Sequence, residues 1–339
     1  MLRILSSATK CLSARHCSGF LSRMKFMKKL REDDVSCAAV LQNSCVFLFH
    51  HLSPLLQRTE RETFRPAVLF SSDVLSILER LGSDKSLLNE SVLIGCSEQN
   101  QPQFCLDVGK LDQAAVEKEC GGNFVNLKKS FFLLTEADAP LVAKGQALLR
   151  WHQTNRFCSA TGQPTHRNQA GSQRVCRSSG AVYYPKMSPV VIVLVSDGRR
   201  CLLGRQSSFP LGMYSALAGF CEMGETLEEA LCREVAEEVS LEVQSISYSS
   251  SQHWPFPQSS FMMGCHASVS PAHTLLSIDH TELEDARWFT LEEIDTALQV
   301  KTLPRRGDPL TVWLPPKHAL ANRLIAEWAM RQRGNRVEP

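Results

Sequence analysis

Residues 219–241 read GFCEMGETLEEALCREVAEEVSL, and this stretch decides the fold of the C-terminal half of the chain. Thr226 precedes Glu229 by three residues, the spacing of a capping box, so we predict that a helix begins near Leu227. At about 100° per residue, one arc of this helix carries apolar side chains that pack and another carries carboxylates on a solvated face. The apolar arc holds Cys232, Val235, Ala236 and Val239, and the acidic arc holds Glu234, Glu237 and Glu238.

The three carboxylates occupy positions i, i+3 and i+4, where each like-charged pair costs roughly a few tenths of a kcal/mol. A bound cation explains such a cluster. Carboxylate oxygens without nearby Cys or His suit Mg²⁺ or Mn²⁺, which also bind phosphate oxygens, so the pattern favours metal-assisted diphosphate chemistry. The alternative is a solvated acidic face in which Arg233 pairs with Glu229. The spacing of Gly219 and Glu225 ahead of the helix argues against that alternative.

This stretch resembles the Nudix box: glycine, five residues, Glu, seven residues, Arg-Glu, an aliphatic residue, any residue and Glu-Glu. The resemblance implies that Glu234, Glu237 and Glu238 bind Mg²⁺ or Mn²⁺, and that one of the last two is the general base. Ser240 stands where the family has glycine. If the residue keeps the left-handed conformation that ends the helix, we expect a cost of roughly 1 kcal/mol.

Residues 251–259 read SQHWPFPQS and resemble the SQPWPFPxS signature of the NADH pyrophosphatase branch of this superfamily. His253 replaces the first proline of the signature. Two prolines and two aromatic rings predict a rigid loop that offers a flat surface to a nucleotide base. The resemblance spans roughly residues 156–328. It implies hydrolysis of NADH or NADPH to reduced nicotinamide mononucleotide and AMP, or adenosine 2′,5′-bisphosphate from NADPH.

The resemblance also adds candidate site residues. The carbonyl of Ala218 and the carboxylate of Glu282 join the expected metal ligands. The expected substrate contacts are Tyr184, Phe220, Gln252, Trp254, Phe256, Pro257, Ser259 and Ala321.

Members of this branch usually carry a zinc ribbon with two CxxC pairs, whose four thiolates fill a tetrahedral site. Here the corresponding tetrapeptides are CSAT from Cys158 and CRSS from Cys176, so two of the four thiolates are missing. We therefore expect a degenerate ribbon without zinc.

The fold class expected is α+β, in which a Nudix fold with a mixed sheet between helices follows the ribbon and an N-terminal mixed α/β domain. The expected boundaries are 1–31 for a mitochondrial transit peptide, 35–150 for the N-terminal domain, 151–185 for the ribbon-like segment and 186–331 for the Nudix domain. The leader is expected because eight basic residues precede the first acidic residue, Glu32. The alternative is a basic N-terminal tail that has no targeting role. His50 and His51 lack metal-ligand spacing and are interpreted as surface or core residues.

Composition limits the partners. The net charge is +2, from 37 basic and 35 acidic residues, which disfavours nucleic acid as the main substrate. No apolar run has the length of a bilayer span, and 13 scattered cysteines indicate reduced thiols. The resemblance implies a homodimer. Two alternatives remain: the same chemistry on another diphosphate, such as an NAD cap on RNA, and a Nudix module that binds a nucleotide without hydrolysing it.

Overall fold

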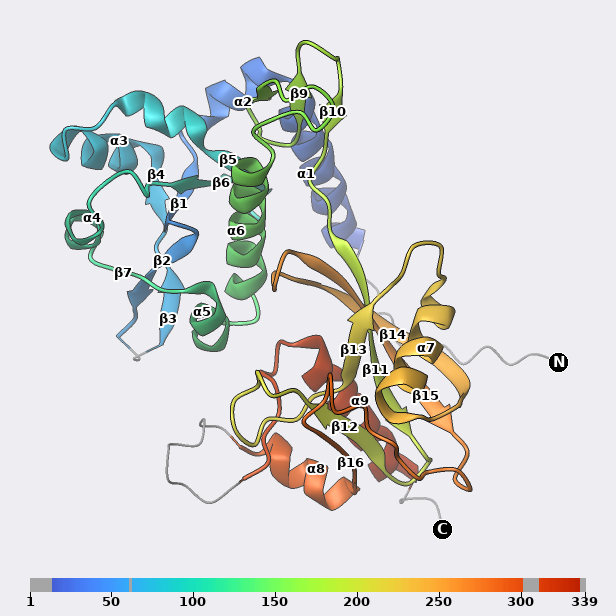
Figure 1. Cartoon of the computed structure of the whole chain (residues 1–339). Helices are drawn as coiled ribbons and strands as arrows, with labels where there is room; N and C mark the ends of the chain where they lie inside the picture. Colours follow the sequence, from blue (N-terminus) through green and yellow to red (C-terminus); the bar gives the residue numbers. More distant parts are fainter. Residues whose placement is uncertain (1–13, 61–62, 301–310, 336–339) are drawn as a thin grey trace. The chain divides into compact units, whose positions relative to one another are not determined.

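The chain divides into two units between Pro185 and Lys186 in the computed structural model (Figure 1). The structure describes residues 14–60, 63–300 and 311–335. Among these residues, no helix combines the length and the apolar character that crossing a bilayer requires.

The first unit contains two sheets. Its elements up to the last long helix are α1 (Ala14–Glu32), α2 (Asp34–Leu41), β1 (Cys45–His50), β2 (Ser53–Arg58), β3 (Phe64–Pro66), β4 (Leu69–Phe70), α3 (Ser71–Arg80), the 3-10 helix η1 (Lys85–Glu90), β5 (Val92–Cys96), β6 (Pro102–Asp107), α4 (Gln113–Cys120), β7 (Asn123–Phe124), α5 (Leu127–Leu133) and α6 (Asp138–Thr154). The main sheet has the order β3-β2-β1-β6-β5, with β4 beside β1 and β7 beside β2. Only the β1–β6 pair in it is parallel.

The helix α1 overlaps the expected leader, residues 1–31. Met27 and Leu30 are buried in the core of the first unit, at 3% and 0% exposure. The backbone carbonyl of Arg31 accepts a hydrogen bond from Asn168 in the ribbon. The last turns of α1 therefore pack into the first unit, although the expected leader extends to residue 31. Residues 1–13 lie outside the described residues.

A small antiparallel sheet follows α6. It has the order β10-β9-β8 and consists of β8 (Thr165–Arg167), β9 (Arg174–Cys176) and β10 (Val182–Tyr183). Arg167 ties this sheet to the rest of the unit, because its guanidinium donates hydrogen bonds to the carbonyls of Asn89, Glu90 and Ser91.

The second unit is built on a mixed sheet of order β14-β15-β11-β12-β16, with β13 also paired to β11. Its elements are β11 (Ser188–Ser196), β12 (Cys201–Arg205), β13 (Leu217–Phe220), α7 (Leu227–Val239), β14 (Val243–Trp254), β15 (Ser260–Val269), β16 (Asp285–Phe289), α8 (Leu291–Leu298) and α9 (Leu320–Asn335). The β11–β15 pair is parallel and the others are antiparallel.

The side chains of β11 alternate between two cores, because successive residues of a strand point to opposite faces. Val190, Ile192 and Leu194 join the core that α8 and α9 cover, whereas Val191, Val193 and Val195 join the core that α7 covers. The expected mixed sheet between helices is thus confirmed, and α7 lies where its acidic residues can approach the sheet.

Candidate active site

The loop from β13 to α7 is organised as the capping-box spacing predicts. The Thr226 hydroxyl accepts from the backbone N–H of Glu229 at 3.2 Å, and the Glu229 carboxylate accepts from the N–H of Thr226 at 2.8 Å. The helix begins at Leu227 and ends at Val239. Ser240 has φ 57° and ψ 39°, so it does adopt the left-handed conformation in which the family has glycine.

The helical faces differ from the predicted arcs. Cys232 and Ala236 are exposed, whereas Glu234 and Glu238 are only 8% and 2% exposed and share the buried face with Val235. The prediction of a solvated acidic arc is therefore wrong for these two glutamates. The reason is that the helix packs on the sheet through a wide face that includes them.

A three-carboxylate cluster forms between α7 and the loop before β16. Glu234, Glu238 and Glu282 each offer an oxygen, and these oxygens lie within 4.8 Å of one another. Asp279 joins the two segments, because its N–H donates to the carbonyl of Glu238 and its own carbonyl accepts from the N–H of Glu282. The structure thus brings Glu282 to the site although it is 44 residues from Glu238.

The negative charges of this cluster are not balanced by enough nearby positive charge. Burial, followed by the charges of Glu234, Glu282 and Glu237, raises the pKa of Glu238 to about 8. The Oε2 atom of Glu238 is buried without a hydrogen-bond partner among the described residues. Burial also raises the pKa of Glu234, partly offset by Arg233. A buried, unpartnered carboxylate oxygen beside two other carboxylates fits the oxygen ligand set of a hard divalent cation.

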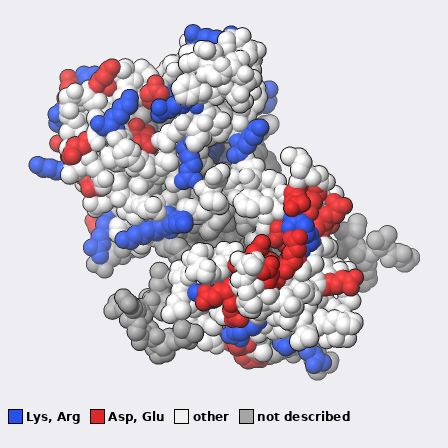
Figure 2. All heavy atoms as spheres, viewed as in Figure 1, with Lys and Arg blue, Asp and Glu red and all other residues white. Residues whose placement is uncertain are grey.

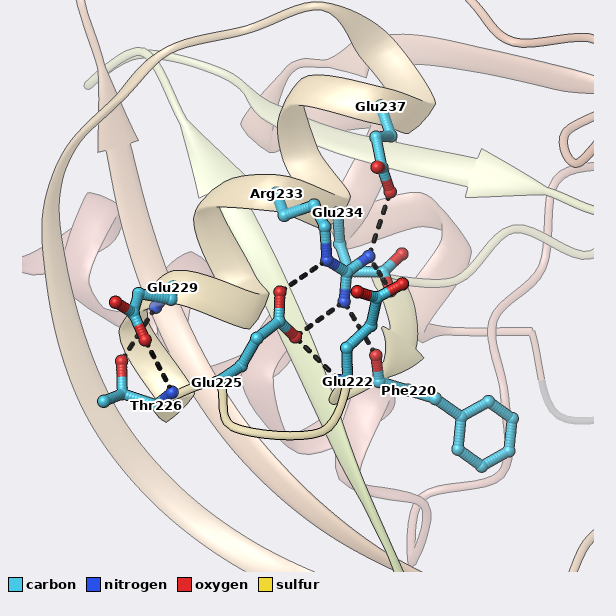
Figure 3. A network of polar contacts seen from close by, with 8 residues as sticks. All are labelled: Phe220, Glu222, Glu225, Thr226, Glu229, Arg233, Glu234 and Glu237. Carbon is cyan, nitrogen blue, oxygen red and sulfur yellow. Dashed lines mark hydrogen bonds and ion pairs between the residues drawn. The ribbon is translucent and has the colours of Figure 1, made fainter.

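Arg233 is the centre of a hydrogen-bond network between α7 and the loop before it (Figure 3). Its guanidinium holds both oxygens of Glu225, at 2.7 and 2.9 Å, and donates to Glu234, Glu237 and the carbonyl of Phe220, each at 2.9 Å. The pair with Glu225 holds the pKa of that carboxyl down to about 2. The alternative pairing of Arg233 with Glu229 is not formed, because Glu229 closes the capping box.

Glu237 lies outside the three-carboxylate cluster. Its side chain is 58% exposed and pairs with Arg233. Figure 2 shows acidic side chains gathered on one face of the second unit, with basic atoms among them.

Gly219 explains the first position of the motif. It pairs with Val191 on β11, one residue after Ala218, which pairs with Ile192. A methyl group built on its α-carbon would overlap the carboxylate of Glu234. Glycine therefore lets that side chain lie directly against the strand. This contact of Gly219 and the hydrogen bonds of Arg233 were not predicted from the sequence as part of the site. Both Gly219 and Arg233 nevertheless belong to the motif that resembles the Nudix box.

The aromatic segment is partly strand rather than loop. Residues 251–254 belong to β14 and pair with β15, and only residues 255–259 form the connection. The Trp254 and Phe256 rings meet edge to face, with centroids 5.6 Å apart. His253 takes the place of the signature proline and its Nε2 lies 2.8 Å from the hydroxyl of Ser259. Pro257 is exposed at the tip of this connection.

Four of the expected substrate contacts lie in surroundings that differ from one another. The amide of Gln252 donates to the carbonyl of His318 and accepts from the N–H of Leu320, so it anchors the start of α9. Ala321 is 5% exposed and packs in the core beneath α9. Phe220 is 53% exposed, and its ring points away from the Arg233 network (Figure 3). Tyr184 is 58% exposed and belongs to the first unit.

The ribbon surrounds its two thiols with hydroxyl groups. Cys158 Sγ lies 3.0 Å from the Tyr183 hydroxyl and 3.6 Å from that of Ser179. Cys176 Sγ lies 3.2 Å from the Ser178 hydroxyl and 3.6 Å from that of Thr161. Thr161 and Ser179 occupy the positions of the missing thiolates, and neutral hydroxyls are poor substitutes for them at a structural zinc site.

Comparisons with known proteins match three parts of the chain to known domains. The NUDIX domain model matches residues 186–314, the model of the NADH pyrophosphatase-like rudimentary NUDIX domain matches 43–151, and that of the NADH pyrophosphatase zinc ribbon domain matches 153–184. The mitochondrial NAD(P)H pyrophosphatase NUDT13 of Mus musculus is 48% identical over 92% of this chain and 91% of its own length. Its Homo sapiens counterpart is 46% identical over 93% and 92%. The NAD-capped RNA hydrolase NUDT12 of Homo sapiens is 42% identical over 58% of this chain and 42% of its own length.

Proposed function

The chain belongs to the NADH pyrophosphatase branch of the Nudix hydrolases, and from this we propose that it hydrolyses the diphosphate bridge of NADH or NADPH. The products are reduced nicotinamide mononucleotide and AMP, or adenosine 2′,5′-bisphosphate from NADPH. The observation that carries the proposal is the buried cluster of Glu234, Glu238 and Glu282, in which one carboxylate oxygen has no partner among the described residues.

Divalent metal ions complete this site. We assign Glu234, Glu238 and Glu282 as ligands of Mg²⁺ or Mn²⁺, joined by Glu237 and the carbonyl of Ala218. Such ions offset phosphate charge and lower the pKa of the attacking water. The chain itself positions the ligands: Arg233 holds Glu234 by a charged hydrogen bond, and Gly219 leaves room for that carboxylate beside the strand.

Glu237 or Glu238 accepts the proton of the attacking water. Glu237→Gln and Glu238→Gln are each expected to abolish turnover. A variant that still binds Mn²⁺ with wild-type affinity but does not hydrolyse NADH identifies the base, because a ligand's loss would weaken metal binding as well.

We keep the substrate-binding residues that the family resemblance implies, except for Gln252. Trp254, Phe256, Pro257 and Ser259 lie at or beside the connection after β14, where aromatic rings can meet a nucleotide base. Tyr184, Phe220 and Ala321 are retained as candidates. Gln252 is reassigned to positioning, because both ends of its amide already bind the backbone at the start of α9.

A substrate panel tests the proposal. The purified chain is incubated with Mg²⁺ or Mn²⁺ and NADH, NADPH, NAD⁺, ADP-ribose, diadenosine polyphosphates or NAD-capped RNA, and the products are separated by chromatography. Selective release of reduced nicotinamide mononucleotide is expected. Binding of NADH without hydrolysis would mean a non-catalytic module, and preferred cleavage of capped RNA would assign the chain to the activity named for NUDT12.

The same relatives support a mitochondrial location, since both are named mitochondrial. We propose that a basic N-terminal leader directs the chain there and is cleaved before Met27, because that side chain and Leu30 are needed in the core. N-terminal mass spectrometry of the protein from mitochondria tests this. A homodimer is proposed from the family alone, and sedimentation equilibrium tests it.

Residues 153–184 match the zinc ribbon domain of this family. We propose that this domain holds no zinc, because hydroxyl groups replace two of the four thiolates. Elemental analysis of the purified chain is expected to give far less than one zinc per chain. The matched variant T161C/S179C restores four thiolates and is expected to bind about one zinc. Stoichiometric zinc in the unmodified chain would overturn this proposal.

A further inference from the structure

A cavity of about 880 Å³ lies within the first unit, apart from the carboxylate site of the second. Residues of η1, β6, α6, β8 and β9 and their connecting loops line it. Its volume falls in the range of about 300–1,000 Å³ that small-molecule sites occupy. A cavity of this size can hold a nucleotide, whereas it far exceeds a single inorganic anion.

The cavity wall is rich in cations without anionic partners. Lys110, Arg156, Arg167 and Arg174 line it, and none of them lies within 4.0 Å of a carboxylate oxygen among the described residues. The hydrogen bonds of Arg167 go to three backbone carbonyls, and those of Arg174 go to Thr165 and His152. These acceptors are neutral, and the charge of Glu90 acts on both guanidinium groups without a direct ion pair.

Lys110 and Arg156 are the two cations free to take a ligand. Both side chains are exposed, and neither makes a hydrogen bond within the described part of the chain. Three acids also line the wall. Glu90 is exposed and its charge acts on Arg167 and Arg174, whereas the other two are engaged in hydrogen bonds. Asp84 accepts from the N–H and hydroxyl of Ser86, and Asp107 accepts from three backbone N–H groups.

Backbone strain marks the same wall. His51 and Leu52, between β1 and β2, have φ 47° and 66°, in a two-residue hairpin turn that ordinarily takes Asn or Gly. The carboxylate of Asp107 holds this turn through the N–H groups of both residues, at 3.1 and 3.0 Å. This turn places His51 on the cavity wall.

Apolar side chains complete the lining. Leu87, Leu106 and Leu149 contribute to it, together with Phe157, which is 65% exposed. An exposed aromatic ring beside unpaired cations is the combination that binds a base and a phosphate together.

We propose that this cavity is a second nucleotide-binding site, which takes a nucleoside phosphate such as AMP. Lys110 and Arg156 bind the phosphate, and Phe157 stacks on the base. The site is independent of the carboxylate cluster and needs no divalent metal, because its phosphate ligands are cationic side chains. It gives the first unit a role in binding nucleotides.

Calorimetric titration of the full chain with AMP, in a chelator that empties the carboxylate site of metal, tests this proposal. One AMP per chain is expected. The charge-reversal variant K110E/R156E is expected to bind at least about tenfold more weakly, since two charged hydrogen bonds are lost. The matched control R65E/K129E changes the same net charge at two exposed residues outside the cavity and is expected to bind as the wild type does.

Two further measurements separate the two sites. Glu238→Gln is expected to keep AMP binding in chelator, and K110E/R156E is expected to keep hydrolysis of NADH. Inorganic phosphate is expected to bind more weakly than AMP because it cannot reach Phe157. The proposal is overturned if AMP does not bind in chelator, if Glu238→Gln removes binding while K110E/R156E does not, or if phosphate binds as tightly as AMP.

Discussion

At the scale of single residues, the carboxylate cluster departs from the ordinary rule that charged groups stay in water. Glu238 is 2% exposed and its Oε2 has no partner among the described residues, although Glu234 and Glu282 lie beside it. An unsatisfied buried polar group costs about 1–3 kcal/mol. The metal-free site is therefore expected to be a source of instability that a cation relieves.

Glu238→Gln tests this cost. In chelator at pH 8 we expect the variant to unfold at a higher temperature than the wild type, by the equivalent of about 1–2 kcal/mol, because it removes a buried charge. Differential scanning calorimetry measures the shift. Glu242→Gln, at an exposed glutamate just after α7, is the control and should leave the melting temperature unchanged. A destabilised Glu238→Gln variant would contradict the idea that the wild-type carboxylate is unsatisfied.

Gly219→Ala tests the close approach of strand and carboxylate. The added methyl group overlaps the Glu234 carboxylate, so this side chain must leave its position. We expect Mn²⁺ binding to weaken by about tenfold or more and turnover to fall with it. Titration followed by electron paramagnetic resonance measures the affinity. Gly334→Ala, where the new methyl group meets open space, should change neither quantity.

At the scale of elements, the capping box and the left-handed end of α7 follow from local sequence, because each depends on residues within one or two turns. Which face of the helix is buried does not. Periodicity alone places Glu234 and Glu238 on the wet side, whereas β13 and the loop before β16 enclose them. Burial of a carboxylate depends on partners distant in sequence, and the helix itself carries no signal of them.

Ser240→Gly removes the strain at the end of α7. Since φ is 57° at this position, glycine adopts the conformation without the penalty of a Cβ atom, and we expect a gain of about 0.5–1 kcal/mol. Urea unfolding monitored by circular dichroism measures it. Ser240→Ala keeps the Cβ atom and should give no such gain. Equal stability of the glycine variant and the wild type would show that the serine is not strained.

The last turns of α1 are expected to be part of the folded unit. Met27→Ala combined with Leu30→Ala removes two buried side chains and should cost about 4 kcal/mol or more, because each leaves a cavity. Phe20→Ala with Leu21→Ala alters two side chains that are 51% and 57% exposed and should cost little. Thermal unfolding of both variants measures the difference. If the two pairs have equal effects, α1 does not belong to the core.

At the scale of the whole molecule, the sequence predicts the α+β class and the catalytic helix, while contacts between distant segments require the structure. Glu282 is assigned to the metal site only by resemblance, and its link to α7 through Asp279 has no local signal. The family resemblance predicts that Gln252 contacts the substrate. In the structure, both ends of its amide instead make hydrogen bonds with the backbone at the start of α9. His51 reads as an ordinary histidine because the turn that strains it is held by Asp107, 56 residues away.

The junction between α6 and the ribbon predicts how the first unit responds to acid. His152 on α6 faces Arg174 and the carbonyl of Gly171, both in the ribbon. An arginine only donates, so Nδ1 at 3.2 Å is an acceptor and the Nε2–H donates to the carbonyl at 2.9 Å. This arrangement requires a neutral ring, and burial lowers the pKa of His152 to about 4.

Acid should therefore loosen this junction. In the unfolded chain the ring has its ordinary pKa of 6.5, so between pH 6.5 and 4 the unfolded state binds more protons than the folded one. The stabilisation is complete above pH 6.5 and is lost as the pH falls to 4, with about 2 kcal/mol lost between pH 7 and pH 5. Urea unfolding at both pH values, followed by hydrogen exchange in peptides of the first unit, measures this loss.

The variant His152→Gln cannot be protonated at this position, so its stability should change less between pH 7 and pH 5. The control His273→Gln changes an exposed histidine of the second unit and should behave as the wild type does. If His152→Gln keeps the full acid sensitivity, another group is responsible and the neutral imidazole does not hold the ribbon to α6.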